Sequence, residues 1–120
     1  MSTGSVNESP RIAWVREHAA ELIALAASCG GTRLCLCGSV SRNEDKVGSD
    51  IDLYVWDFDA GVPGTMEELE AHQRATALVK AIRALSPYPV DVRGIPGWCL
   101  DAPHEASMRQ DAIELSSLVG

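Results

Sequence analysis

Two segments of the chain place apolar residues three or four positions apart, which is the spacing of an amphipathic helix. Ser9 and Pro10 are a typical N-cap and first helical position, and we expect the first helix to run from there to about Ser28. The sequence Thr65-Met66-Glu67-Glu68 is a capping box that begins a second long helix, which we expect to end near Leu85. The apolar residues expected to face the core are Trp14, Ala19, Leu22, Ile23, Leu25, Ala26, Leu69, Ala75, Leu78, Val79, Ile82 and Leu85.

Shorter runs of apolar, β-branched and aromatic residues predict strands. They lie at residues 33–37, 50–56, 88–93 and 112–115, the last as an edge strand. A loop is expected at residues 57–64 and a short helix at residues 101–109. This order predicts an α/β fold, a single compact domain at residues 9–120 with a mixed β-sheet and helices mainly on one face, after a flexible polar tail at residues 1–8.

Two carboxylates open the strand at residues 50–56. Asp50 and Asp52 are two positions apart, so on a strand they share one face, with their backbones roughly 6.5–7 Å apart. Ile51, Leu53 and Val55 then point to the opposite face and into a core. Two carboxylates at this separation can converge on one divalent cation or on a pair of them.

A Gly-Ser turn follows the strand at residues 33–37. Gly38 allows the backbone to swing sharply and lets a polyphosphate approach the main chain, while the Ser39 hydroxyl and the amides of a short helical turn can donate to phosphate oxygens. Arg42 lies three residues further on and offers a cationic fork. Mg²⁺ suits such a place, because it is normally held by one or two protein carboxylates together with phosphates and water.

A third aspartate lies on a later strand. Asp91 stands between Val90 and Val92 in a short alternating run, so it faces away from both valines. If this strand neighbours the one that begins at Asp50, the three carboxylates come together. A Gly-Ser pair alone is typical of ordinary turns, and an Asp-x-Asp pair alone is often a solvated strand edge, so it is the conjunction that indicates a site.

An apolar residue, Gly-Ser, ten intervening residues and Asp-Ile-Asp-Leu resemble the signature of the DNA polymerase β-type nucleotidyltransferase superfamily, and most of all its minimal nucleotidyltransferase (MNT) group. The resemblance runs from about Leu34 to Leu115 and makes residues 9–120 a nucleotidyltransferase domain. The chain has Asn43 where relatives often have glycine, and asparagine enters the left-handed backbone region readily. It has Val40 where relatives often have arginine.

The resemblance implies roles for the candidate residues. Asp50, Asp52 and Asp91 would be catalytic and ligate two Mg²⁺ ions, with Asp91 orienting or deprotonating the attacking group. ATP or another nucleoside triphosphate would be the donor. The residues expected to bind its phosphates are Gly38, Ser39 and Arg42.

The composition of the chain limits the kinds of partner that we expect it to bind. A chain of 120 residues with a net charge of −7 has room for one domain and lacks the clustered cations that nucleic acid requires. It has no apolar run near the length of a membrane span and no signal segment, so we expect a cytoplasmic protein with no membrane or nucleic-acid partner. The four cysteines lack metal-site spacing and are expected to be buried reduced thiols.

The acceptor is not encoded in the motif. Minimal nucleotidyltransferases of this size resemble type VII-like antitoxins, which transfer AMP to a tyrosine of a HEPN toxin, and this is the leading hypothesis. One alternative is a small-molecule enzyme of the aminoglycoside-modifying kind. Another is a non-catalytic binding module that neutralises its partner by contact.

Overall fold

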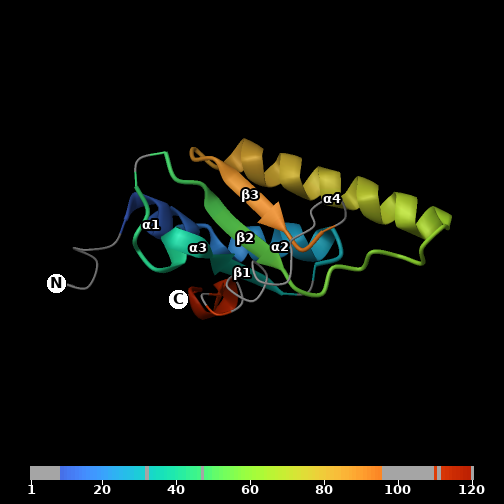
Figure 1. Cartoon of the computed structure of the whole chain (residues 1–120), viewed down its shortest axis with the longest axis horizontal. Coiled ribbons are helices and arrows are strands. Elements are labelled where there is room, and N and C mark those ends of the chain that lie inside the picture. Colours follow the sequence, from blue (N-terminus) through green and yellow to red (C-terminus); the bar gives the residue numbers. More distant parts are fainter. Residues whose placement is uncertain (1–8, 32, 47, 96–109, 111, 120) are drawn as a thin grey trace.

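The computed structural model describes residues 9–31, 33–46, 48–95, 110 and 112–119, and Figure 1 shows how their helices and strands are arranged. A mixed four-stranded sheet runs in the order β3-β2-β1-β4, and the predicted α/β class is confirmed. The elements are α1 (Pro10–Glu17), α2 (Ala19–Ser28), β1 (Leu34–Cys37), α3 (Gly38–Ser41), β2 (Ile51–Val55), α4 (Met66–Leu85), β3 (Val90–Arg93), β4 (Ile113–Glu114) and a 3₁₀ turn, η2 (Leu115–Ser117).

The sheet combines both pairing directions. β1 pairs antiparallel with β2 and with β4, whereas β2 pairs in parallel with β3. The parallel pair needs a crossover connection, which α4 supplies by lying alongside β3 (Figure 1). β4 lies at one edge of the described sheet, as the sequence predicts for its last strand.

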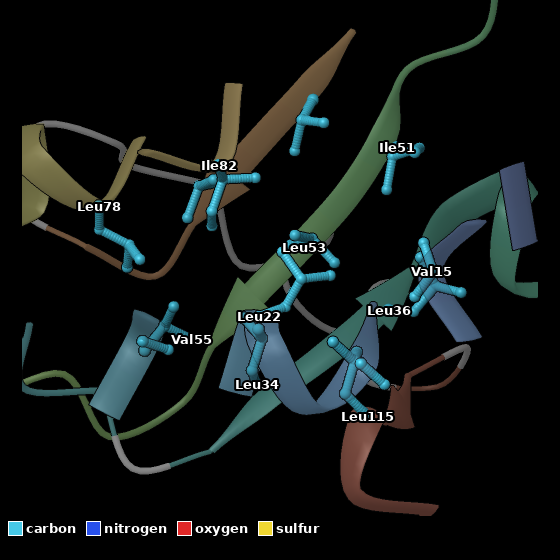
Figure 2. Close-up of a cluster of buried hydrophobic side chains, with 14 of the residues drawn as sticks. Val15, Leu22, Leu34, Leu36, Ile51, Leu53, Val55, Leu78, Ile82 and Leu115 are labelled. Atoms are coloured by element: carbon cyan, nitrogen blue, oxygen red, sulfur yellow. The ribbon is translucent and has the colours of Figure 1, made fainter. Parts of the chain in front are cut away.

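The main core lies between the sheet and the helices α1, α2 and α4. Ile51, Leu53 and Val55 of β2 are fully buried, which confirms the predicted alternation. Figure 2 shows Val15 and Leu22 from the first two helices, Leu78 and Ile82 from α4, and Leu115 from η2 approaching the same strands. Helices therefore cover one face of β2 and leave Asp52 on the other.

The single first helix that the sequence predicts is divided at His18. Ser9 caps α1 as expected, because its hydroxyl accepts the amide of Ile12 at 3.2 Å. At His18 the backbone leaves the helical region (φ −106°, ψ 10°), and the ring stacks on Trp14 while its Nδ1 lies 2.9 Å from the Trp14 carbonyl oxygen. The same Trp14 carbonyl also accepts the His18 amide at 3.0 Å, and α2 begins at Ala19.

The second long helix begins and ends as predicted, with two local differences. Thr65 occupies the N-cap position, but its side chain accepts no hydrogen bond from the amides of the first helical turn. Its hydroxyl donates to the Val62 carbonyl at 2.6 Å. Leu69 is 50% exposed, so its placement on the core face was wrong. At about 100° per residue, Leu69 lies well over 90° from the face that carries Ala75 and Ile82. The apolar residues of this helix lie on more than one face, and the face that packs against the core is not the one that carries Leu69.

Some sequence predictions lie outside the described residues: the tail at residues 1–8, the helix at residues 101–109, and the thiol of Cys99. Ile95, which is described, is buried in the core. No helix in the described part of the chain is both long enough and apolar enough to span a membrane.

Candidate active site

The turn after β1 brings the backbone of Gly38 against Asp52. Gly38 has φ +72°, in the left-handed region that favours glycine, and begins the short helix α3. A Cβ at this position would lie 2.5 Å from Asp52 Oδ2. The position therefore excludes any side chain for two reasons, its backbone conformation and the carboxylate that lies over it.

Asp52 and Asp91 lie side by side. They are Cα partners in the parallel pair β2–β3, and on the other side Asp52 is the partner of Cys37 in β1. Adjacent strands are about 4.8 Å apart, so the two carboxylates project from the same face of the sheet at close range. The predicted neighbourhood of the two aspartate strands is thus confirmed.

The pKa of Asp52 is raised by burial and by the closeness of these carboxylates. Burial, and then the negative charge of Asp91, raise the pKa of Asp52 from 3.8 to about 6, with a smaller rise from Asp50. The positive charge of Arg93 opposes the rise. Asp50 itself precedes β2 and is exposed. Three carboxylates that repel one another in this way make a place where a cation is stabilised.

The donor set fits a hard divalent cation such as Mg²⁺, because it consists of carboxylate oxygens. The described residues contain no group of three His, Cys, Asp or Glu side chains already arranged to ligate one ion. Each of the two oxygens of Asp91 lies near a guanidinium group, that of Arg83 or that of Arg93. Residues Asp50, Asp52 and Asp91 are therefore the candidate ligands by their chemistry, with Asp91 engaged in ion pairs.

The two remaining predicted site residues lie in and after α3. Ser39 is half-buried, and its carbonyl accepts the amide of Glu44 at 2.8 Å. Arg42 is exposed and donates from Nε to Glu44 Oε1 at 2.6 Å, so its guanidinium is turned toward this glutamate. Asn43 has φ +56°, which confirms that asparagine can serve a turn where glycine is common.

Arg83 and Arg93 are neighbours of the site that the sequence analysis did not single out. Arg93 Nη2 lies 3.6 Å from Asp91 Oδ2, and Arg83 Nη2 lies 3.9 Å from Asp91 Oδ1. Strand alternation could have found Arg93, because it is two positions after Asp91. Arg83 had no local signal, since it extends from the last turn of α4 and also donates to the Val90 carbonyl at 3.3 Å.

A partly buried arginine, Arg11, holds the loop that connects α3 to Asp50. Arg11 Nε donates to the Ser49 carbonyl at 2.9 Å, and Nη1 lies 3.5 Å from Asp45 Oδ2. The Asp45 side chain is only 2% exposed. The guanidinium of Arg11 also lies over the ring of Tyr88, 4.8 Å from its centroid. One side chain of α1 thus contacts both the loop before Asp50 and the segment that leads into β3.

The cysteines do not contribute ligands in the described structure. Cys35 and Cys37 are buried on the side of β1 that packs with Tyr54, and neither they nor Cys29 are in a disulfide. Burial raises the pKa of the Cys35 thiol, and the Trp56 indole donates to its sulfur at 2.8 Å. These contacts confirm the expectation of buried thiols for Cys35 and Cys37.

The arrangement places the carboxylates of Asp52 and Asp91 beside the Gly38 turn on one face of the sheet. Comparison with known proteins adds no family, because no family model and no curated protein matches the chain.

Proposed function

We propose that the protein is a Mg²⁺-dependent nucleotidyltransferase that transfers a nucleoside monophosphate, AMP from ATP in the first instance, to a hydroxyl group. The observation that carries this proposal is the register of Asp52 beside Asp91, directly over the bare backbone of Gly38. Paired carboxylates next to a turn that admits phosphate match the needs of phosphoryl chemistry, which depends on positioning and charge stabilisation.

The residues would divide the work along the sheet. Gly38 and Ser39 would receive the β- and γ-phosphates, with Arg42 available once it leaves Glu44. Asp50, Asp52 and Asp91 would hold two Mg²⁺ ions. When bound, these ions lower the pKa of an attacking hydroxyl and neutralise charge on the leaving oxygens.

The transfer itself breaks one phosphate bond and forms another. The acceptor oxygen attacks the α-phosphorus, the bond to the β-phosphate oxygen breaks in line, and pyrophosphate leaves. The hydroxyl proton passes to the carboxylate of Asp91.

We further propose that the acceptor is a protein hydroxyl, a tyrosine of a HEPN-type toxin, so that the protein acts as an antitoxin of the MNT group in the cytoplasm. Cys35 and Cys37 are in no disulfide, which fits a reducing compartment. A partner protein would itself supply the acceptor surface.

Intact mass spectrometry tests the proposal. The protein is incubated with Mg²⁺, ATP and the product of the adjacent gene, and compared with its Asp50→Asn, Asp52→Asn double variant. We expect AMP on the partner only with the unaltered protein. The matched control is Asp57→Asn, which removes an exposed carboxylate just past the other end of β2 and should keep transfer.

The alternatives give different results in the same experiment. Tight binding of the partner by both the unaltered protein and the double variant, without any AMP addition, would establish a contact-only module. Transfer to an aminoglycoside in place of the partner would establish the small-molecule enzyme.

A further inference from the structure

Two arginines gather at the site although the chain as a whole is acidic. The net charge is −7, yet Arg83 and Arg93 both face the single carboxylate of Asp91. Arg93 also acts on Asp52, the strand partner of Asp91. The edge of the sheet at β3 therefore carries two guanidinium groups close to the carboxylates of the site.

The two arginines are only loosely engaged. Their N–O distances to Asp91 are 3.6 and 3.9 Å, longer than the roughly 2.7–2.9 Å of a charge-assisted hydrogen bond. The Arg83 side chain is 51% exposed and the Arg93 side chain 29% exposed. By contrast, Arg42 is bonded to Glu44 at 2.6 Å. Both guanidinium groups at β3 are thus placed to receive another anion.

The strand order separates these arginines from the phosphate turn. Gly38 follows β1, Asp52 lies on β2, and Arg93 lies on β3, which is an edge of the described sheet. At about 4.8 Å per strand, Arg93 lies roughly 10 Å across the sheet from the Gly-Ser turn. In an in-line displacement the attacking and leaving groups lie on opposite sides of the phosphorus. With pyrophosphate at Gly38, the acceptor approaches over β3.

Resting on the proposed function, we propose that Arg83 and Arg93 bind an anionic group of the acceptor beside its reacting hydroxyl. The substrate class is then a polypeptide in which a tyrosine is flanked by aspartate or glutamate. The arginines act as specificity residues, and the transfer chemistry stays with the carboxylates.

The test uses two synthetic peptides of equal length, each with one tyrosine, flanked by glutamates in one and by lysines in the other. Binding of the fluorescein-labelled peptides is measured by anisotropy with Mg²⁺ and a non-hydrolysable ATP analogue present, and AMP incorporation is measured with ATP. We expect the glutamate peptide to bind at least about tenfold more tightly, and the Arg83→Gln, Arg93→Gln double variant to lose that preference. The KM for ATP should stay unchanged in the double variant.

The matched control is Arg33→Gln. Arg33 also pairs with a carboxylate, that of Glu114, but it does so at the opposite edge of the sheet. The Arg33→Gln variant should keep the preference for the glutamate peptide. Thermal unfolding of each variant verifies that the fold is intact before binding is compared.

Several outcomes would overturn the inference: no binding of the glutamate peptide, equal binding of both peptides, a preference that survives in the double variant, or a raised KM for ATP with peptide binding unaltered. The last outcome would assign the arginines to the nucleotide. Failure of the proposed function looks different, because arginine-dependent binding of the glutamate peptide would then persist while no hydroxyl acceptor received AMP.

Discussion

The two faces of β2 differ in what their side chains do for the folded state. Ile51, Leu53 and Val55 are fully buried against the helices and stabilise the fold. On the other face, Asp52 is held beside Asp91 with a pKa of about 6, which means that its charged form is destabilised by its surroundings. The apolar side chains on one face of β2 therefore stabilise the fold, whereas the charged form of Asp52 on the other face destabilises it. Substitutions can change these two contributions separately.

The largest expected effect is on the buried face. Leu53→Ala removes a fully buried side chain from the middle of the sheet, and we expect the free energy of unfolding to fall by about 3–5 kcal/mol. Urea unfolding followed by circular dichroism measures this change. A loss below about 1 kcal/mol would mean that the core around β2 is not packed as described.

The next largest loss of stability is expected at the turn after β1, where Gly38 lies against Asp52. Gly38→Ala places a residue with a Cβ at φ +72° and against Asp52 Oδ2, and we expect it to destabilise the protein by about 2–3 kcal/mol. Gly48→Ala is the matched control, because Gly48 has φ +90° but no atom within 4 Å of its added Cβ. We expect it to destabilise by about 1 kcal/mol only. Equal losses in the two variants would remove the Asp52 contact from the explanation.

A change of opposite sign is expected at Asp52 itself. Its folded pKa of about 6 exceeds the ordinary 3.8, so the folded protein binds this proton more tightly than the unfolded chain does. The stabilisation that protonation provides is fully present below about pH 4 and is lost as the pH rises through about 6. Asp52→Asn removes this loss and should be more stable than the natural chain by about 1–2 kcal/mol at pH 7.5, after allowance for the solvent that reaches the group.

Unfolding experiments in EDTA at pH 4 and at pH 7.5 measure this difference, which should shrink at the lower pH. Asp57→Asn serves as the comparison, because it removes an exposed carboxylate just past the other end of β2 without altering the site. A destabilised Asp52→Asn at pH 7.5 would show that the carboxylate is held by favourable contacts and is not crowded.

The smallest effect lies outside both faces. Leu69 is 50% exposed on the side of α4 away from the core, so Leu69→Ser should change the free energy of unfolding by no more than about 0.5 kcal/mol. Leu78→Ala on the buried side of the same helix should lower it by about 3 kcal/mol. Thermal and urea unfolding of the two variants decide which face of α4 packs.

The sequence predicts those features that depend on residues close together in the chain. Alternation in β2 and β3 is enough to place Asp52 and Asp91 opposite the buried residues, and the Gly-Ser turn follows from the end of β1. The division of the first helix at His18 and the exposed position of Leu69 depend on which of two plausible packings has the lower free energy. Arg83 shows the limit most clearly, since its contact with Asp91 exists only because α4 packs under β3.

The contacts of Arg11 determine how much of the chain the site requires. This arginine of α1 holds the Ser49 carbonyl and Asp45 in the loop before Asp50, and the amide of Ser9 donates to Asn43 in the same loop. A fragment that begins at residue 33 would retain every candidate site residue and lose these anchors. Transplanting the site into another scaffold, or trimming the protein to its signature, therefore requires the first helix to be carried along with the carboxylates.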